Sequence, residues 1–435
     1  MKFFIKTFGC QMNVNDSEKL NYILSKRGMK RVEGPEKADL IIINSCAVRE
    51  KAQEKIFSFI GRLKRDQKIV VSGCVAQSEK DQILKRNDKI DFVVGTHQFY
   101  NINDIIDDYL LKNEKGTMTD LSRKWSETVP DVYARDNGFT GFISIMEGCD
   151  NFCTYCIVPF TRGREKYRPF RNIIEEAEYL AGKGFQEIVL IGQNVNSWKD
   201  SESGISFASL LEKVAEIKGL KWIRFITSYP GYYEDDLIDV MKRNRNIARN
   251  IHFPVQSGST RVLKKMNRIY SREKYLQIIS KFKREIPEIT FSSDFIVGFP
   301  GESDRDFNLT LSLMEKVRYD SVFSFIYSPR KHTKAAVLKD DIEPEIKKMR
   351  LQKLHELQKR IQLEEHGKLV GREFEVMVTG KNPRRDGELL GRTESYKVVN
   401  FPGDFLPGEF VKVRIERFGP YSLRGIEAKL KPAFT

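Results

Sequence analysis

Three apolar runs near the start of the sequence each end in a cysteine, and this pattern restricts the fold more than any other feature. The runs are Phe3–Cys10, Leu40–Cys46 and Ile69–Cys74. Stretches with helical spacing, Asp16–Arg27 and Val48–Arg65, separate them. Strands that alternate with helices form a parallel sheet whose two faces are both covered. We therefore expect an N-terminal open α/β sheet, with Asp16 or Ser17 as the N-cap of its first helix.

The cysteines that end these runs, Cys10, Cys46 and Cys74, are called the strand-end triad here. Ligands gather outside the carboxyl ends of the strands in parallel sheets, so these thiols should meet at one edge of the domain. A lone cysteine in such a place is usually a small apolar core residue. Three of them from three strands indicate a metal or cluster site. Structural disulfides are not expected, because the chain has the features of a cytosolic protein and that compartment is reducing.

A second domain follows a polar segment at residues 112–138, which is predicted to be a linker. Its apolar runs are Phe142–Glu147, Glu187–Gly192, Trp222–Ser228, Ile251–Val255, Phe291–Gly298 and Ser321–Tyr327. Amphipathic stretches separate them, which predicts a full or partial α/β barrel with its catalytic groups at the strand ends. A doubly wound sheet is the alternative. From Gly371 the runs become short and are broken by glycine and proline, as in a small β-barrel. The expected domains are residues 1–115, 135–366 and 367–431.

The sharpest chemical signal is the spacing Cys149–x3–Cys153–x2–Cys156, called the loop triad here, directly after the first strand of the second domain. Three thiolates on one loop can each hold a corner of a cubane cluster, whose irons prefer cysteine sulfur. A structural zinc site needs a fourth ligand, and the nearest histidines, His97 and His252, are remote in sequence. With three protein ligands, one iron stays open to chelate a substrate. Three inert cysteines are the alternative interpretation.

Several stretches of the sequence resemble the radical S-adenosylmethionine (SAM) methylthiotransferase family. They are TFGCQMNVNDSE, INSCAVRE, SGCVAQ, EGCDNFCTYCIVPFTRGRE, IGQNVNSW, TSYP, PVQSGS and SSDFIVGFPGE. The resemblance covers essentially the whole chain in order, including a C-terminal RNA-binding barrel of the TRAM type. Within the family, CQMN and PVQSGS are most similar to the bacterial tRNA 2-methylthioadenosine synthase branch.

The resemblance implies two 4Fe–4S clusters. The loop triad would hold the radical-generating cluster, whose open iron chelates the amino and carboxylate groups of SAM. The strand-end triad would hold an auxiliary cluster, where a methylthio group is built with a second SAM as the methyl donor. The implied reaction places that group on C2 of an isopentenylated adenosine at position 37 of tRNA, next to the anticodon.

Polar residues that end predicted barrel strands, Gln193, Ser228 and Asp294, are candidates for contact with SAM or the base. Residues in such places are equally often caps of the next helix. The basic loop Arg162–Arg168 beside the loop triad is a candidate for phosphate contact, with internal salt bridges as the alternative. A second basic stretch, Lys381–Arg385 in the expected small barrel, suits single-stranded or loop RNA.

The net charge of +14 and the pI near 9.3 favour an acidic partner, of which nucleic acid is the commonest. No apolar run approaches the roughly 18–20 residues that cross a bilayer. The segment Met1–Cys10 carries lysines and has no signal-peptide cleavage site. Together with the resemblance, these features predict a cytoplasmic monomer that binds the anticodon loop of tRNA, SAM and a reductant such as flavodoxin or ferredoxin.

Two other functions remain open at this point. A related branch of the family modifies threonylcarbamoyladenosine in tRNA or an aspartate on a ribosomal protein. A protein of another class, a non-catalytic iron–sulfur redox sensor that binds RNA, is the second. Two separate triads, each with an open site, favour an enzyme, because a sensor has no evident need for both.

Overall fold

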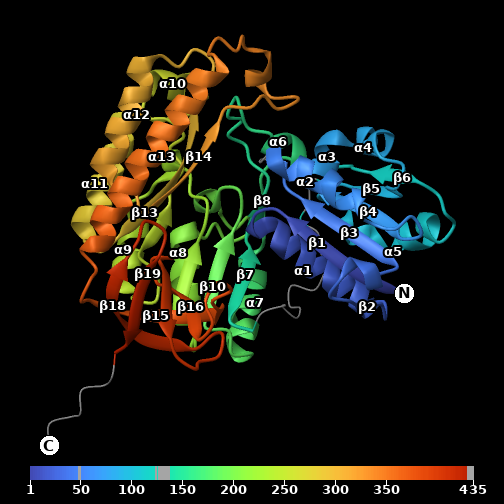
Figure 1. Ribbon diagram of the computed structural model, residues 1–435, viewed down its shortest axis with the longest axis horizontal. Coiled ribbons are helices and arrows are strands. Elements are labelled where there is room, and N and C mark those ends of the chain that lie inside the picture. Colours follow the sequence, from blue (N-terminus) through green and yellow to red (C-terminus); the bar gives the residue numbers. More distant parts are fainter. Residues whose placement is uncertain (48–49, 123–124, 126–137, 429–435) are drawn as a thin grey trace, which may run out of the picture.

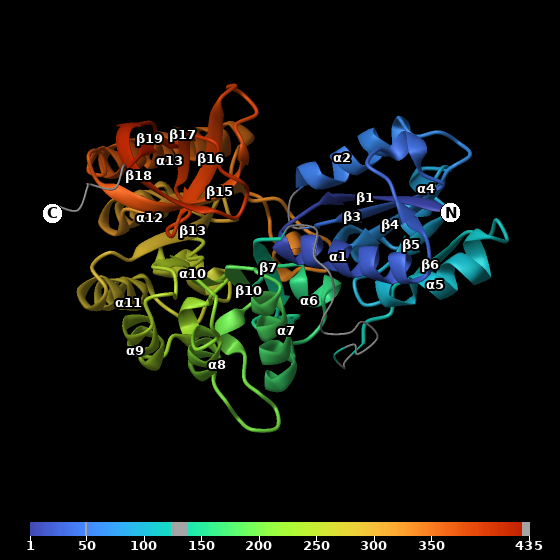
Figure 2. The ribbon, with the colours of Figure 1, turned by 90° about the horizontal axis from the view of Figure 1, so that it is seen from below.

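The computed structural model describes residues 1–47, 50–122, 125 and 138–428 of the chain. Figure 1 shows an N-terminal domain in blue beside a central domain in green to orange, with a small barrel in red against one end of the central domain. Seen from below in Figure 2, the small barrel and the N-terminal domain lie at opposite sides of the molecule. Within the described residues, every helix is too short or too polar to span a lipid bilayer.

The N-terminal domain is an open parallel sheet in the order β2-β1-β3-β4-β5-β6. Its strands are β1 (Lys2–Phe8), β2 (Lys30–Arg31), β3 (Leu40–Ser45), β4 (Lys68–Gly73), β5 (Phe92–Val94) and β6 (Gly116–Met118). Every residue of β3 is buried, as expected for a strand with both faces covered. The strand order reverses between β1 and β3, and that switch point is where such sheets bind ligands.

Helices cover both faces of this sheet. They are α1 (Gln11–Lys26), α2 (Glu50–Gly61), α3 (Cys74–Glu79), α4 (Asp81–Arg86) and α5 (Ile102–Ile105). On one face Leu20 of α1 and Ile102 of α5 share an apolar cluster with Ile42. On the other, Ile60 of α2 and Val75 of α3 form part of a second cluster. The predicted open α/β sheet is therefore confirmed.

The first helix begins five residues earlier than Asp16, so the prediction that Asp16 or Ser17 is its N-cap is wrong. Cys10 occupies the N-cap position, and its backbone N–H donates to Asn13 Oδ1 at 3.3 Å. The side chain of Cys10 in turn accepts from the backbone N–H of Asn13. This capping box fixes the first turn of α1 at the end of β1. Asp16 lies inside the helix and is buried, where it forms the ion pair with Arg162 described below.

The central domain is a partial α/β barrel, as one of the two sequence interpretations predicted. Two parallel three-stranded sheets, ordered β11-β10-β7 and β12-β13-β14, meet at an isolated bridge between Ile223 and Ile247. The strands are β7 (Thr140–Ser144), β10 (Glu187–Ile191), β11 (Trp222–Phe225), β12 (Asn250–His252), β13 (Thr290–Val297) and β14 (Ser321–Ile326). Met146–Glu147 does not extend β7 but pairs as β8 with β9 (Lys166–Tyr167) in an antiparallel ladder.

The helices of the central domain cover the outside of these strands, except the first of them, which lies against α3 of the N-terminal domain (Figure 1). They are α6 (Val158–Thr161), α7 (Phe170–Gly182), α8 (Phe207–Ala215), α9 (Asp236–Arg243), α10 (Thr260–Lys265), α11 (Arg272–Glu285), α12 (Asp304–Val317) and α13 (Pro344–Gly367). The side chains of Ser206, Ser271 and Ser303 accept a backbone hydrogen bond at the start of α8, α11 and α12. These caps satisfy N–H groups that have no partner within the helix.

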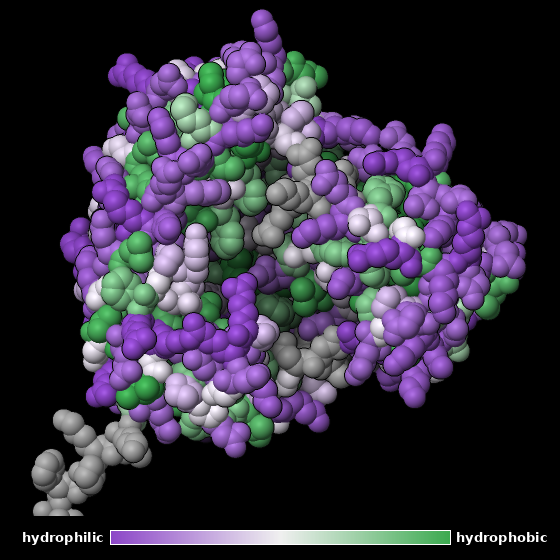
Figure 3. Space-filling view, viewed as in Figure 1, coloured by the Kyte–Doolittle hydropathy of each residue, from purple (hydrophilic) through white to green (hydrophobic). Residues whose placement is uncertain are grey.

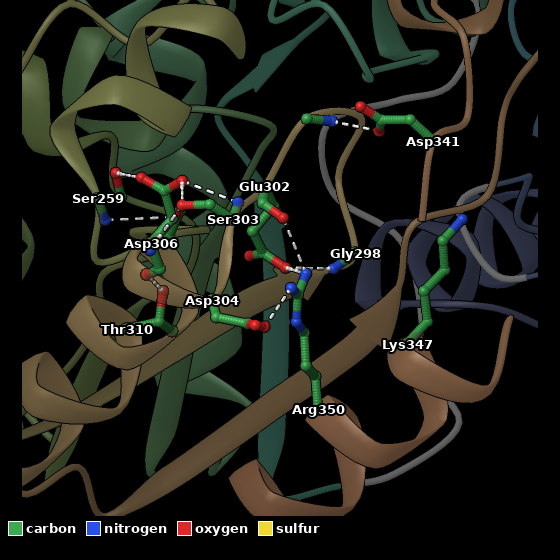
Figure 4. A network of polar contacts seen from close by, with 12 residues as sticks. Ser259, Gly298, Glu302, Ser303, Asp304, Asp306, Thr310, Asp341, Lys347 and Arg350 are labelled. Carbon is green, nitrogen blue, oxygen red and sulfur yellow. Dashed lines mark hydrogen bonds and ion pairs between the residues drawn. The ribbon is translucent and has the colours of Figure 1, made fainter. Parts of the chain in front are cut away.

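Helix α13 is fixed to the barrel by a buried ion pair, shown in Figure 4. Arg350 Nη1 donates to Glu302 Oε2 at 2.9 Å, and Gly298 N donates to the same oxygen at 2.7 Å. Glu302 and Arg350 are 3% and 4% exposed. The pair therefore joins α13 to the loop that follows β13, one of the strands of the inner wall described below.

The C-terminal domain is a closed five-stranded barrel, as predicted. Its strands are β15 (Glu373–Lys381), β16 (Glu388–Thr393), β17 (Val398–Pro402), β18 (Phe410–Phe418) and β19 (Leu423–Glu427), closed in the order β15-β16-β17-β19-β18. It docks on the central domain where β10 and β11 begin, since Arg392 pairs with Glu187 and Phe410 packs on Trp222 with ring centroids 4.7 Å apart.

Part of the expected linker is structured, because Gly116–Met118 forms the edge strand β6. The predicted domain limits at residues 135 and 431 lie outside the described residues, and so does most of segment 123–137.

Candidate active site

Each cysteine of the strand-end triad lies at the carboxyl end of its strand. Cys10 follows β1, Cys46 follows β3, and Cys74 begins α3 directly after β4. Gly73 precedes Cys74 with φ of +90°, and a Cβ there would lie 2.4 Å from Asn44 Oδ1. Only glycine allows both this backbone conformation and this close approach. The sheet thus brings the triad to its carboxyl edge, as the sequence predicts, beside the switch point between β1 and β3.

The thiols of this triad interact with one another and with one arginine. A hydrogen bond with Cys46 is the largest influence that lowers the pKa of Cys10 to about 6, and the charge of Arg162 adds to it. Burial raises the pKa of Cys74, while Arg162 acts in the opposite direction through its charge and a hydrogen bond. Residue Cys10 reaches the molecular surface, whereas its thiol lies against these buried partners.

The loop triad lies between β8 and α6. Gly148 opens the loop with φ of +81°, and a Cβ there would lie 2.1 Å from the carbonyl oxygen of Arg164. Burial raises the pKa of Cys149 to about 11 and that of Cys156 to about 12. At neutral pH these thiols therefore become thiolates only beside a positive charge. The metal ions of a bound cluster would supply such a charge.

The donor set in both places fits an iron–sulfur cluster. Each place has three cysteines that lie close enough to affect one another. The charges of Cys149 and Cys153 raise the pKa of Cys156, and the charge of Cys10 raises the pKa of Cys74. Across residues 1–47, 50–122 and 138–428, no three Cys, His, Asp or Glu side chains are grouped to hold a metal ion. A cubane takes each cysteine on a separate iron, so its ligands do not meet at one point.

The segment that directly follows the loop triad packs against the N-terminal domain. Ile157, the residue after Cys156, packs in the same apolar cluster as Cys74 and Ala76. The hydroxyl of Thr96 donates to the carbonyl oxygen of Thr161 at 2.5 Å. The two triads therefore both lie at the interface between the N-terminal and central domains.

The three polar strand-end residues have different surroundings. Gln193 accepts a hydrogen bond from Gly148 N at 2.6 Å, so it holds the start of the loop triad. Ser228 is 2% exposed, and its hydroxyl has no hydrogen-bond partner within the described part of the chain. Asp294 lies 3.5 Å from His252 Nε2 and is partly exposed. Contact of these residues with SAM stays a prediction.

A wall of mixed character lines the inner face of β12, β13 and β14, and it is called the inner wall here. In these parallel strands Asp294 pairs with Phe323 and Ile296 pairs with Phe325, so paired side chains point to the same side. Phe323 and Phe325 are 48% and 38% exposed. Ile296 packs on the same apolar cluster as Tyr155, the residue before Cys156 in the loop that carries the loop triad. One end of the inner wall therefore lies beside that loop.

The prediction that the basic loop Arg162–Arg168 contacts phosphates is wrong for its buried members. Arg162 pairs with Asp16, Lys166 with Glu147, and Arg168 with Glu176. Side chains paired in the interior are not available to a nucleic acid. The alternative interpretation, a set of internal salt bridges, is the correct one.

Exposed Arg164 of the same loop pairs with Asp150. In the second basic stretch, Lys381 at the end of β15 and Arg384 and Arg385 between β15 and β16 are exposed, as a role in RNA contact requires.

Another buried arginine, Arg268, belongs to no motif that the sequence displays. Its Nη1 lies 3.5 Å from Cys153 Sγ, and its Nη2 donates to the carbonyl oxygen of Pro254 at 2.5 Å. The guanidinium carbon lies 4.4 Å from the ring centroid of Tyr229 and 5.2 Å from that of Tyr270. Arginine stacked between aromatic rings is held in one orientation, here beside a thiol of the loop triad.

Comparison with protein families divides the chain into three matches. Residues 2–95 match "Uncharacterized protein family UPF0004", residues 143–314 the radical SAM superfamily, and residues 367–426 the TRAM domain. Among solved structures, a radical S-adenosylmethionine methyltransferase, TsrM from Kitasatospora setae, is similar with a TM-score of 0.56 and 12% identity, over 77% of this chain and 74% of that one. The cobalamin-dependent radical enzyme OxsB is similar with a TM-score of 0.53 and 15% identity, over 82% and 56%.

Curated relatives match over nearly their whole length. The tRNA-2-methylthio-N(6)-dimethylallyladenosine synthase of Clostridium botulinum (strain Langeland) is 43% identical over 98% of this chain and 97% of its own. The protein of the same name from Myxococcus xanthus is 43% identical over 99% and 95%. The chain belongs to the radical SAM methylthiotransferase family, in the branch whose curated members bear that name.

Proposed function

We propose that this protein is a tRNA-2-methylthio-N(6)-dimethylallyladenosine synthase, which methylthiolates C2 of isopentenylated adenosine at position 37 of tRNA. The names of relatives such as the Clostridium botulinum enzyme support this assignment. One observation in the structure carries it: two cysteine triads from different domains lie at one interface. Methylthiolation needs both a radical and a sulfur source at one substrate atom, and this arrangement supplies two places for them.

We assign a 4Fe–4S cluster to each triad. The loop triad would hold the cluster that binds SAM, and the strand-end triad the auxiliary cluster. The loop-triad cluster supplies one-electron reductive cleavage of SAM when it is bound. The chain's own contribution is to bury Cys153 and Cys74 away from water and to fix the loop through Gln193 and Arg268.

We assign SAM contacts to Gln193, Ser228 and Asp294. The unpartnered hydroxyl of Ser228 is buried, so a ligand atom there would satisfy a hydrogen-bonding group that otherwise costs stability. The adenine base and its dimethylallyl group would lie against Phe323 and Phe325 of the inner wall. Exposed aromatic rings offer both a stacking surface for a base and an apolar surface for a branched hydrocarbon.

The proposed domains are residues 1–115 for the auxiliary cluster, 135–366 for the radical core and 367–431 for RNA binding. The exposed Lys381, Arg384 and Arg385 support RNA contact by the small barrel. The protein would act as a cytoplasmic monomer on the anticodon loop of tRNA and take electrons from flavodoxin or ferredoxin.

Mass spectrometry of tRNA nucleosides tests the substrate. A deletion strain should accumulate the isopentenyl nucleoside without its 2-methylthio group. Expression of the wild-type protein in that strain should restore the 2-methylthio group. A variant with alanine at the loop triad should not. Retention of the 2-methylthio-isopentenyl nucleoside in the deletion strain would show that the branch is wrongly assigned.

A second assay separates the enzyme from a redox sensor. Anaerobically reconstituted protein mixed with dithionite and SAM should release 5′-deoxyadenosine. A sensor should release none, so the absence of this product from protein with a full iron content would contradict the radical mechanism.

A further inference from the structure

Arg162 belongs to the central domain, six residues after Cys156, yet it reaches the strand-end triad of the N-terminal domain. It forms an ion pair with Asp16 of α1, the helix that Cys10 caps, and it directly follows α6, which begins beside Ile157 in the apolar cluster that contains Cys74. Its positive charge lowers the pKa of both Cys10 and Cys74. The residue is 2% exposed. One domain therefore places a permanent positive charge beside the cysteines of the other.

The position of this guanidinium is fixed from two directions. Its Nη2 donates to Asp16 Oδ2 at 2.5 Å, and Asp16 lies on α1, the helix that Cys10 begins. Its Nη1 lies 3.9 Å from Glu147 Oε1, beyond hydrogen-bonding distance. Asp16 is itself buried, so the pair is shielded from solvent and its geometry is rigid.

Part of the donor capacity of Arg162 is unused. Among the described residues, buried Nη1 has no hydrogen-bond partner. A buried guanidinium N–H without an acceptor is costly. Thiolates and the sulfides of a cluster are anionic acceptors that would satisfy it.

We propose that Arg162, from the central domain, is a positioning residue for the auxiliary cluster of the N-terminal domain. Its charge also raises the reduction potential of that cluster. This inference rests on the assignment of a cluster to the strand-end triad. A cluster gains negative charge when it is reduced, and a fixed positive charge in a buried place stabilises that state. Removal of the charge should therefore lower the midpoint potential.

The test uses full-length protein with alanine at Cys149, Cys153 and Cys156, so that only the strand-end triad can hold a cluster. Iron content is measured first, and the midpoint potential is then measured by a redox titration followed by electron paramagnetic resonance. Arg162→Gln should shift the midpoint to a more negative value. Arg162→Lys, which keeps the charge, should retain most of the parent potential.

A matched control is Arg168→Gln, which breaks an equally buried ion pair with Glu176 of α7, outside the strand-end triad. This control should leave the midpoint unchanged. An unchanged midpoint in Arg162→Gln, or an equal shift in Arg168→Gln, would overturn the proposal.

Failure to load the cluster is also informative. If Arg162→Gln binds no iron, loading restored by Arg162→Lys supports the need for the charge, and loading absent from both variants contradicts it. If the parent with only the strand-end triad holds no cluster, the cluster assignment fails together with this inference. If the parent loads and the variants behave like it, this inference alone fails.

Discussion

At the scale of single residues, the interface between the two triads is a set of buried charges. His97 Nε2 lies 3.2 Å from Lys166 Nζ and 3.6 Å from Glu147 Oε2. Ser122 N donates to His97 Nδ1 at 3.0 Å. Burial is the largest cause that lowers the pKa of His97 to about 4, so this ring is neutral at physiological pH.

This histidine makes stability depend on pH. Between pH 6.5 and about 4, His97 is protonated in the unfolded state but neutral in the folded state. The stabilisation is present above pH 6.5 and is lost as the pH falls to about 4, by up to about 3 kcal/mol for a shift of this size. Chemical denaturation of apo protein at several pH values measures it, and His97→Gln should flatten the slope. The same slope in both proteins would contradict this origin.

The roles of single residues were predictable only where position in the fold determines them. Cys46 and Cys74 were placed correctly, because a parallel sheet brings its strand ends to one edge. Internal salt bridges were one of the two interpretations of the loop Arg162–Arg168, but the partner and the position of Arg162 were not predictable. Its partner Asp16 is 146 residues away in sequence, and a charged residue in a basic run is usually solvated.

At the scale of elements, the inner wall is the part of the barrel best suited to select the substrate. Phe323 and Phe325 point to the same side as Asp294 and Ile296, and the ring of Phe323 lies 6.0 Å from that of His252 in an edge contact. The wall is thus apolar towards the loop triad and polar towards the other end.

Substitution of Phe325 by alanine should weaken selection for the isopentenyl group. Removal of one apolar contact of this kind costs about 1–2 kcal/mol, or roughly tenfold in kcat/KM. Steady-state assays with isopentenylated and unmodified anticodon stem–loop RNA measure the ratio. Tyr179→Ala, an exposed aromatic on α7 outside the barrel, is the matched control. Unchanged selectivity in the Phe325 variant would exclude this wall as the contact.

Elements themselves were largely predictable, because apolar periodicity marks them. The amphipathic stretch between the predicted strands Phe291–Gly298 and Ser321–Tyr327 is α12, and Ser303 and Asp306 form a capping box at its start. The start of α1 was missed because cysteine is not a usual N-cap. The turn of Met146–Glu147 into a separate ladder with β9 depends on a long-range pairing that no local pattern shows.

At the scale of the whole molecule, the small barrel and the cysteine triads lie at opposite ends of the central strands. The barrel packs where β10 and β11 begin, through Glu187 and Trp222, whereas the triads follow the carboxyl ends. Figure 3 shows a hollow between the N-terminal and central domains. An RNA held by the barrel and modified at the triads must therefore extend along the molecule. This docking depends on surfaces far apart in sequence and was not predictable.

Alanine at Lys381, Arg384 and Arg385 should weaken RNA binding in a salt-dependent way. Each single-strand phosphate that the protein no longer neutralises reduces the slope of log K against log salt by about 0.7. Fluorescence anisotropy with an anticodon stem–loop at several salt concentrations measures this slope. Alanine at the exposed Arg62, Lys64 and Arg65 of the N-terminal domain is the control. Equal slopes for both triple variants would contradict a specific role of the barrel loop.

The most direct measurement is the iron and sulfide content of anaerobically prepared protein and its two triple-alanine variants. The account predicts about eight irons in wild type and about four in either variant, since on the proposed assignment each triad would hold its own cubane. It is contradicted if wild type carries zinc or a single cubane, or if either variant keeps the iron content of wild type.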